Sequence, residues 1–433
     1  MRSRLLAGAI LAGAAVVGWL SITSILVARL LQGVIVLSLC YVGYLAWRGY
    51  RVMRQAISTA GTLDAASAGG AEPWLSVVIP AANEAEVIGA LVGDLAAQEY
   101  GVPGRPNFEV LVIDDGSADG TAGAAHAASP TALVRRREPG SGPATKGAVL
   151  AWGQPAVSGE IVVVLDADAR VGPGFLRAAI RAWRRDPDAA ALQVQRRVIN
   201  RRRGWLPAAQ DEEQLMDMAS QCGRWATDGT AELRGNGMFV RRASLERAGG
   251  WPQHALTEDL DLSTRLTAVG ERITLAPEVE VQEQAVEGPG DLWRQRLRWA
   301  EGSLRRLIQH GPALVADSGL PLKRRLDFIL FIGEFLIPPV FVAAIVASLV
   351  TIPLPEPADW TVPVTLFVGY GLGTYLLALA GLAARGEPLL RLVGRATRGA
   401  LFLSHWLLIV PAALVRIVVG PATSRFVRTP RNR

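Results

Sequence analysis

Two adjacent carboxylates, Asp114 and Asp115, directly follow the aliphatic run Val110–Ile113. Such a run is typical of a buried strand, and in open α/β sheets ligands bind beyond the carboxyl ends of the strands. Carboxylates in the glycine-containing turn that follows could accept hydrogen bonds from a nucleotide base or from ribose hydroxyls. The alternative is a helix cap, because Ser117 and Asp119 both cap helices well.

The same arrangement of strand and polar residue occurs at two other places. Asp166 and Asp168 follow Ile161–Leu165, and Asn83 and Glu84 follow the strand-like segment VVIP. In extended backbone, residues two apart point to the same side, so we expect Asp166 and Asp168 to form a hard-oxygen site for Mg²⁺ or Mn²⁺, shared with substrate phosphates. For Asn83 and Glu84, a helix cap is the alternative.

Lys146 is notable because the chain is rich in arginine and has only one other lysine, Lys323. Its segment, GSGPATKG, fails the pattern of a Walker phosphate loop, since Thr145 rather than glycine precedes the lysine. Lys146 could contact a diphosphate from a loop, or it could be a solvated surface lysine. The segment alone does not separate these two interpretations.

A third group of carboxylates comprises Glu258, Asp259 and Asp261 in LTEDLDL, before an amphipathic segment. If the reaction transfers a group such as a sugar to a hydroxyl, a general base must remove the proton of that hydroxyl. A carboxylate close to the transferred group can act as this base. The alternative is structural, with Thr257 capping a helix whose first turn favours negative charge.

Gln295, Arg298 and Trp299 lie in DLWRQRLRWAEG, shortly before the C-terminal apolar region. An arginine can neutralise the charge of a leaving diphosphate, and an indole can stack on a sugar. The alternative is a basic juxtamembrane helix that touches lipid headgroups.

The elements that must position these residues alternate between short aliphatic strands and helical stretches. This alternation predicts an α/β domain with a parallel sheet over residues 74–310. A linker rich in small residues, 55–73, precedes it. The regions on both sides are strongly apolar, and hydrophobic residues make up 50% of the chain.

The N-terminal region, residues 1–54, is too long and apolar for a single span of ~20 residues. It predicts a transmembrane hairpin of Leu5–Val27 and Leu30–Trp47, with a turn at Arg29. The alternative of a cleaved signal peptide is disfavoured, because the second apolar stretch follows at once. Arginines flank both ends of the hairpin, so we expect an even number of crossings and a cytoplasmic α/β domain.

Residues 311–433 contain about three further apolar segments, with a basic amphipathic stretch before the last: Phe328–Ile352, Thr361–Ala384 and Arg398–Gly420. Three crossings would place the C-terminus outside, whereas four arginines in the tail, residues 424–433, favour the inside. Either the last segment does not cross or an upstream assignment must change.

Composition excludes other classes of protein. The net charge of +6 fits a membrane protein whose cytoplasmic faces are rich in arginine. The sequence has no compact basic module with interleaved aromatic residues, which would have indicated binding to nucleic acid. The two cysteines, Cys40 and Cys222, predict neither a disulfide framework nor a metal-thiolate site. We therefore expect a lipid bilayer as a partner and no nucleic acid.

Four motifs occur in an order that resembles the membrane-bound family 2 glycosyltransferases, which include cellulose and hyaluronan synthases and lipid glucosyltransferases. They are DDGS at Asp114–Ser117, DAD at Asp166–Asp168, TED at Thr257–Asp259 and QRLRW at Gln295–Trp299. The resemblance runs from Leu75 to about Leu307. It implies a GT-A fold, a Rossmann-like domain that binds a nucleotide sugar, together with a UDP-sugar donor and inversion at the anomeric carbon.

The resemblance also implies how the donor is held. Glu84 and Asp115 would hold the uridine, and Lys146 would contact the diphosphate. Asp166 and Asp168 would hold the nucleotide and its Mg²⁺.

The remaining motifs carry the implied transfer. Asp259, next to Glu258, would be the catalytic base. Gln295, Arg298 and Trp299 would close over the diphosphate and the acceptor.

A narrower resemblance is to the cyanobacterial monoglucosyldiacylglycerol synthases. It rests on ELRGNGMFVRR at Glu232–Arg242, on Gly249–Trp251 and on RWAEG at Arg298–Gly302. The chain departs from that family at Met238, where a glutamine is expected. The resemblance implies glucose as the sugar and Asn236 as an acceptor contact.

Three functions can be compared on these observations. A lipid glycosyltransferase, which would join glucose from UDP-glucose to 1,2-diacylglycerol, needs only anchoring and lateral access for the lipid. A processive polysaccharide synthase generally needs more helices than the five expected here, to form a secretion channel. A transporter or scaffold would leave the acidic strand ends unexplained. We therefore expect the first function, with another lipid acceptor as a further alternative.

Overall fold

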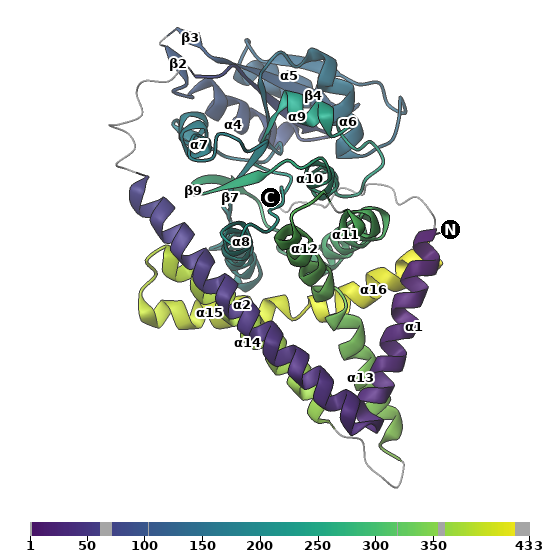
Figure 1. The fold of residues 1–433 in the computed structure, drawn as a ribbon. Coiled ribbons are helices and arrows are strands. Elements are labelled where there is room, and N and C mark those ends of the chain that lie inside the picture. Colours follow the sequence, from purple (N-terminus) through teal and green to yellow (C-terminus); the bar gives the residue numbers. More distant parts are fainter. Residues whose placement is uncertain (1, 61–71, 103, 318, 354–359, 421–433) are drawn as a thin grey trace.

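The computed structural model describes residues 2–60, 72–102, 104–317, 319–353 and 360–420. An α/β domain lies at one end of the molecule, and long apolar helices extend away from it (Figure 1). Most of the predicted linker and all of the basic tail, residues 424–433, lie outside the described residues.

The centre of the α/β domain is a seven-stranded sheet in the order β5-β4-β1-β6-β8-β7-β9. Its strands are β1 Leu75–Ala81, β4 Phe108–Asp114, β5 Leu133–Arg136, β6 Ile161–Val164, β7 Ala191–Val198, β8 Met238–Arg241 and β9 Ile273–Glu283. Two short strands, β2 Gly101–Val102 and β3 Arg105–Pro106, pair separately.

The sheet is mixed, whereas the alternation of strands and helices predicted a parallel one. β1 pairs in parallel with both β4 and β6, as expected, but β8 runs antiparallel to β6 and β7. The hydrophobic pattern of a four-residue buried strand shows that it is buried and not which way it runs. β8 lies between β6 and β7 in the sheet, and its direction depends on the loop that leads the chain into that position.

Two layers of helices cover the sheet. Their bounds are α4 Ala85–Ala96, α5 Thr121–Ala128, α6 Lys146–Gly153, α7 Phe175–Trp183, α8 Trp205–Trp225, α9 Arg242–Arg247, α10 Glu258–Ala268 and α11 Pro289–Ala316, with a 3₁₀ turn at Gln154–Ala156. Alternation along β1 directs Leu75, Val77 and Ile79 towards α4 and α7, whereas Val78 faces α6, α8 and α10.

Five helical segments are long and apolar enough to cross a membrane. They are formed by α1 Arg2–Thr23, α2 Ile25–Thr59, α12 Leu322–Glu334 with α13 Ile337–Thr351, α14 Thr361–Ala384, and α15 Leu389–Leu403 with α16 Trp406–Val419. The segment predicted over Thr361–Ala384 matches α14.

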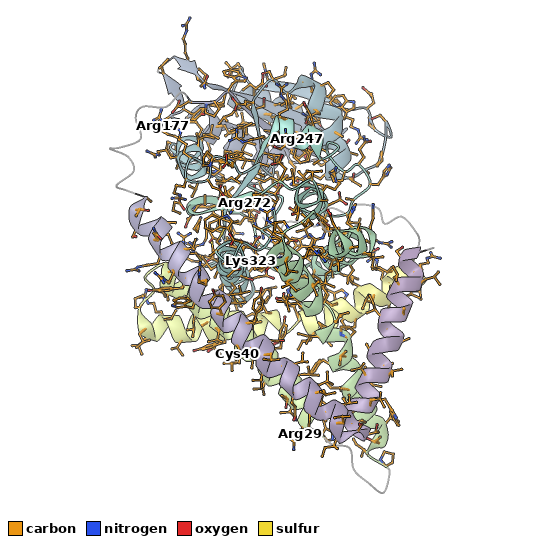
Figure 2. All side chains as sticks on the ribbon, in the orientation of Figure 1. Arg29, Cys40, Arg177, Arg247, Arg272 and Lys323 are labelled. Atoms are coloured by element: carbon orange, nitrogen blue, oxygen red, sulfur yellow. The ribbon has the colours of Figure 1, made fainter. Side chains whose placement is uncertain are left out.

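The hairpin turn lies at Ser24 and not at the predicted Arg29. Ser24 has extended backbone, with φ −126° and ψ 112°, and it separates α1 from α2. Arg29 is exposed on α2 near the end of the hairpin that is far from the α/β domain (Figure 2), where it donates to Gln32. A single charged residue can thus lie within a helix close to the end of a membrane span. Its position therefore does not identify the residue at which the chain turns.

Helix α2 does not end at Trp47 but continues to Thr59, so the predicted boundary at residue 54 falls inside it. Its second half packs on α8, and Met53 reaches the core of the α/β domain. Two glycines make this crossing close. A Cβ added at Gly49 would lie 2.0 Å from the carbonyl oxygen of Ala219, and one at Gly223 would lie 2.3 Å from that of Leu45.

The last apolar segment, predicted as one span over Arg398–Gly420, is two helices. Figure 1 shows α15 and α16 running sideways beneath the α/β domain, across the direction of α1 and α2. On α15, Arg395 pairs with Asp211 and Glu212 of α8. On α16, Arg416 lies 3.0 Å from Glu301 of α11. These ion pairs hold both helices against the α/β domain.

Candidate active site

The loops that follow β1 and β4 are joined by hydrogen bonds. The backbone N–H of Asn83 donates to Oγ of Ser117 at 2.8 Å, and that of Ala118 donates to Oδ1 of Asn83 at 2.9 Å. Asn83 has a φ of 55°, which non-glycine residues seldom adopt. The pairing places Glu84 and Asp115, both predicted to bind the nucleotide, in neighbouring loops at one edge of the sheet.

Asp115 has a partner that the sequence motifs did not indicate. Nη1 of Arg137 lies 2.7 Å from Oδ1 of Asp115, and the arginine side chain is only 4% exposed. Arg137 follows β5, outside all four motifs. Only knowledge that β5 pairs with β4 could have placed it beside Asp115.

Lys146 is not a solvated surface lysine. It begins α6, which is capped by Thr145, whose hydroxyl accepts from the N–H of Ala148 at 3.1 Å. Its Nζ donates to Oδ1 of Asp166 at 2.6 Å and to the carbonyl of Gly235 at 2.7 Å. The helix start therefore brings the ammonium group to the end of β6.

Glu258 and Asp259 open α10 beside this lysine. Oε1 of Glu258 lies 3.4 Å from Nζ of Lys146. A Cβ added at Gly235 would lie 3.2 Å from Oδ2 of Asp259 and 3.6 Å from Nζ of Lys146, which places Asp259 against the loop before Asn236. Thr257 precedes the helix but makes no side-chain capping bond, contrary to the structural alternative.

Glu258 is buried and Asp259 is partly buried, and this changes the acidity of both carboxyl groups. Burial raises the pKa of Glu258 from 4.5 to about 7, with Asp259 adding to the effect and Lys146 opposing it. Burial also raises the pKa of Asp259 above its ordinary value. Burial alone would lower the pKa of Lys146, but Asp166 and Glu258 raise it, so the ammonium group stays charged. A buried carboxylate with a raised pKa suits proton transfer near neutral pH.

Helix α11 brings a second cation to the acidic pair. Arg298 is near enough to Glu258, Asp259 and Asp166 for their charges to favour its charged form, although burial lowers its pKa. Next to it, the side-chain oxygen of Gln295 is buried and accepts no hydrogen bond from the described residues.

Trp299 contacts another arginine. The guanidinium carbon of Arg296 lies 4.3 Å from the centre of its ring, and Arg296 also lies over Phe402 and Trp406, 5.8 Å from each ring centre. Arg296 thus links the indole of Trp299 on α11 to the aromatic rings at the junction of α15 with α16. Sequence spacing could not show this neighbourhood, because the aromatic residues come from distant segments.

Asp166 and Asp168 do not lie in extended backbone. The N–H of Ala169 donates to the carbonyl of Asp166 at 2.9 Å, which closes a turn after β6, so the reason given for their common orientation was wrong. Oδ2 of Asp168 accepts from the N–H of Gln284 at 3.2 Å. Asn236 joins the turn after β6 to the end of β9. Its Oδ1 accepts from the N–H of Asp166 at 3.2 Å, and its Nδ2 donates to Glu283 at 3.1 Å.

The strand ends, the acidic pair and α11 therefore lie together at one edge of the sheet. A family model described as "Glycosyltransferase like family 2" matches residues 72–302. The chain belongs to glycosyltransferase family 2. It is a glycosyltransferase with a GT-A fold, and its sheet is mixed.

Two relatives extend beyond the matched domain. The beta-monoglucosyldiacylglycerol synthase of Synechocystis sp. is 32% identical over 371 residues, which cover 82% of this chain and 74% of the relative. That of Trichormus variabilis is 31% identical over 371 residues, covering 83% and 77%. The similarity therefore includes much of the apolar regions and not the α/β domain alone.

A solved structure supports the fold. A mannosyltransferase from Pyrobaculum calidifontis, in complex with GDP-Man and Mn²⁺, aligns with a TM-score of 0.56 and 20% sequence identity. The alignment covers 87% of this chain and 99% of that chain. At this identity, the likeness concerns the fold.

Proposed function

We propose that this glycosyltransferase moves glucose from UDP-glucose to the hydroxyl of 1,2-diacylglycerol, with inversion, and forms β-monoglucosyldiacylglycerol. One observation carries the proposal. Helix α11 brings Arg298 to the acidic pair, and the same helix packs Ala300, Leu304 and Ile308 against α1 and α16. A lipid acceptor could therefore reach the site along α11. The names of the two cyanobacterial relatives agree with this acceptor.

In the proposed step, Asp259 takes the proton of the acceptor hydroxyl while that oxygen bonds to the anomeric carbon. The bond from this carbon to the diphosphate breaks, and UDP leaves with the electron pair. Asp259 is favoured over Glu258 as the base because Glu258 lies 3.4 Å from Nζ of Lys146, whereas Asp259 faces the loop of Gly235 and Asn236. Asn236 would then contact the acceptor.

The leaving diphosphate would be stabilised by positive side chains. Lys146 and Arg298 approach the carboxylates from two different helices, and Lys146 is held there by its hydrogen bond to Asp166. Charges fixed in this way stabilise a developing negative charge without reorganisation. Gln295 and Trp299, on either side of Arg298, would cover the diphosphate and the sugar, while Glu84 and Asp115 would hold the uridine.

A divalent cation, Mg²⁺ or Mn²⁺, fits this site only if the phosphates of the nucleotide-sugar donor supply some of its ligands. Within the described residues, no group of three or more His, Cys, Asp or Glu side chains is arranged to hold a metal ion. Asp166 and Asp168 are hard oxygen donors at the end of β6, and one or two carboxylates suffice where phosphates complete the shell. A cation held by them would help to neutralise the leaving diphosphate.

We also propose four membrane crossings with the α/β domain in the cytoplasm. The turn between α1 and α2 lies far from the α/β domain, as do the end of α13 and the start of α14 (Figure 1). By contrast, ion pairs hold α15 and α16 against the domain, so these helices would lie along the membrane surface. Four crossings return the chain to the side of the domain, which agrees with the arginines of the tail.

Membranes that contain the protein, incubated with labelled UDP-glucose and diacylglycerol, test the proposed function. The label is expected in a lipid that carries one glucose. Label in a long polymer, without glucolipid, would instead identify a processive polysaccharide synthase. Label in a glycolipid only when another lipid is supplied would identify a different acceptor.

A further inference from the structure

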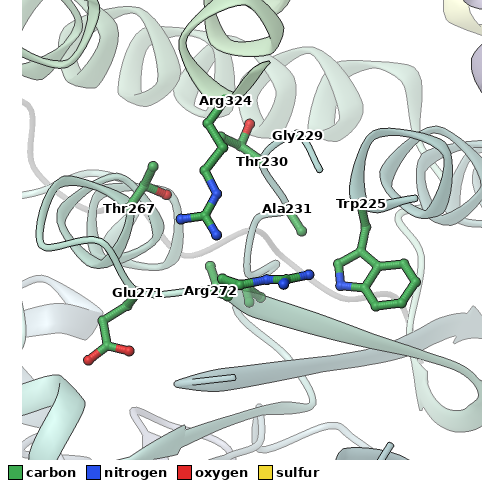
Figure 3. Close-up of a pocket in the computed structure, with 9 residues that line it drawn as sticks. Trp225, Gly229, Thr230, Ala231, Thr267, Glu271, Arg272 and Arg324 are labelled. Carbon is green, nitrogen blue, oxygen red and sulfur yellow. The ribbon is translucent and has the colours of Figure 1, made fainter. Parts of the chain in front are cut away.

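A small pocket with two facing arginines lies away from the acidic pair, where α12 meets the α/β domain. Figure 3 shows Arg324 reaching down from α12 and Arg272 lying just before β9, on opposite sides of the opening. Trp225, at the end of α8, forms one wall. None of these residues takes part in the proposed transfer.

The pocket presents more hydrogen-bond donors than the described residues around it have acceptors for. Arg324 donates only a 3.3 Å bond to the carbonyl of Gly270, and Arg272 lies 3.9 Å from its nearest carboxylate oxygen, on Asp186. The indole N–H of Trp225 is buried without a hydrogen-bond partner in the described residues. Two guanidinium groups that share one opening repel each other, and an anion between them would relieve that repulsion.

The carboxylate in the lining does not relieve it. Glu271 directs its side chain away from Arg272 in Figure 3. Its Oε1 accepts from Nε of Arg247 at 3.1 Å and from the hydroxyl of Ser244 at 3.3 Å. Of the described residues that line the pocket, Glu271 is the only acidic one, so the pocket remains suited to an external anion.

The position of the pocket indicates where that anion comes from. Arg324 lies in the first turn of a candidate membrane span, Leu322–Thr351. Its neighbours on α12, Leu322 and Leu326, are 64% and 49% exposed, as expected for side chains that face acyl chains. Planar arginine forks bind phosphate oxygens well. The hydrogen-bond donors of the pocket therefore lie close to the start of the span, at the depth expected for lipid headgroups.

We propose that this pocket, formed by Arg272, Arg324 and Trp225, binds the phosphate of an acidic phospholipid. The site goes beyond the proposed function, because it is separate from both donor and acceptor. A lipid held there would join the start of α12 to the strand β9 and to the end of α8. It would fix how the α/β domain sits on a membrane that contains acidic lipid.

The test is native mass spectrometry of the full-length protein in detergent, titrated with phosphatidylglycerol, phosphatidylcholine or inorganic phosphate. Variant Arg272→Gln/Arg324→Gln removes the two charges of the pocket. The matched control, Lys323→Gln/Arg51→Gln, removes two exposed charges outside the pocket. Arg324→Gln alone is a milder variant, and thermal unfolding in detergent checks that each protein is folded.

The pocket variant is expected to bind phosphatidylglycerol roughly tenfold or more weakly than the wild type, and the single variant to fall between them. The control is expected to bind nearly as the wild type does, and phosphatidylcholine to bind weakly to all. Equal losses in the pocket and control variants would overturn the proposal, since the effect would then be general surface charge. Displacement of the lipid by equimolar inorganic phosphate would overturn the lipid assignment.

Discussion

Nζ of Lys146 lies 2.6 Å from Oδ1 of Asp166, and this ion pair joins the first turn of α6 to the end of β6. The same ammonium group is 3.4 Å from Glu258, which opens α10. Three elements of the fold therefore meet at one lysine. The positive charge of Lys146 favours the ionised forms of Glu258 and Asp259 and so opposes the effect of their burial.

Replacing Lys146 by methionine should reduce transfer by about 10²- to 10³-fold, the cost typical of a lost electrostatic contact to the reacting centre. The pKa values of Glu258 and Asp259 should rise further, because Lys146 now lowers both. Steady-state kinetics with the labelled donor measure the loss. Lys323→Met is the matched control, since Lys323 is 71% exposed and pairs only with exposed Asp228. Similar losses in both variants would contradict a special role for Lys146.

Replacing Asp259 by asparagine should leave binding of UDP largely intact and lower turnover by about 10²- to 10⁴-fold, as expected when a general base is removed. Calorimetric titration with UDP and a turnover assay separate the two effects. Asp261→Asn is a suitable control, because Asp261 belongs to the same segment but pairs with Arg265 at 2.7 Å. Near-normal turnover in Asp259→Asn would remove this residue as the base.

The pH dependence of activity and of stability should have opposite signs. The base must be ionised, so kcat/KM should rise with pH through the raised pKa values of the acidic pair, with that of Glu258 at about 7. The folded state holds the proton of Glu258 more tightly than the unfolded state does, because the pKa of Glu258 is raised from 4.5 to about 7. The free energy of unfolding should therefore fall as pH rises through this range.

Rate profiles and thermal unfolding across this pH range, for the wild type and Glu258→Gln, check both trends. The variant should lose part of the slope in stability, because its amide does not titrate. An unchanged slope would show that Glu258 has the same pKa in the folded and unfolded states.

Strand ends and motif order located Asp166, Glu258 and Asp259 from the sequence, and the structure brings Asp166 and Glu258 to one lysine. The roles of these residues in transfer stay predictions. The sequence could not predict the contact of Arg137 with Asp115, or that of the Gly235 carbonyl with Lys146, since both depend on which segments become neighbours. The same limit explains the errors at Ser24 and at β8. Local patterns define burial and length, whereas turns and strand directions depend on tertiary packing.

Glu232 should be essential for stability, because it joins the site to α11. Its Oε2 lies 2.8 Å from Arg234, and its other oxygen pairs with Arg306, which also donates to the carbonyl of Leu260 at 3.2 Å. Burial alone would raise the pKa of Glu232, but the surrounding arginines lower it far below its ordinary range.

Glu232→Gln should lower the free energy of unfolding by about 3–5 kcal/mol, because buried Arg306 loses its counter-charge and Arg234 loses one of its two carboxylate partners. Thermal unfolding in detergent measures the change. Glu246→Gln, at an exposed position on α9, should change the midpoint little. If the Glu232 variant unfolded at the wild-type midpoint, the buried network would not contribute to stability.

The close crossing of α2 and α8 should make Gly49 intolerant of a side chain. In Gly49→Ala, the new Cβ would lie 2.0 Å from the carbonyl oxygen of Ala219, so one of the helices must shift. Overpacking costs about 1–3 kcal/mol, and a backbone contact this close is expected at the upper end, above the ~1 kcal/mol by which alanine favours a helix over glycine. Thermal unfolding in detergent should therefore show a lower midpoint.

Gly33→Ala is the matched control for this crossing, because an added Cβ on the same helix would meet no atom within 4 Å. It should leave the midpoint unchanged or raise it. The Gly49 variant should also lose activity at temperatures where it remains folded, since α8 carries Asp217, whose carboxylate lies 2.7 Å from Arg234 beside the Gly235 loop. Full activity in a destabilised Gly49 variant would mean that the membrane hairpin anchors the α/β domain without shaping its site.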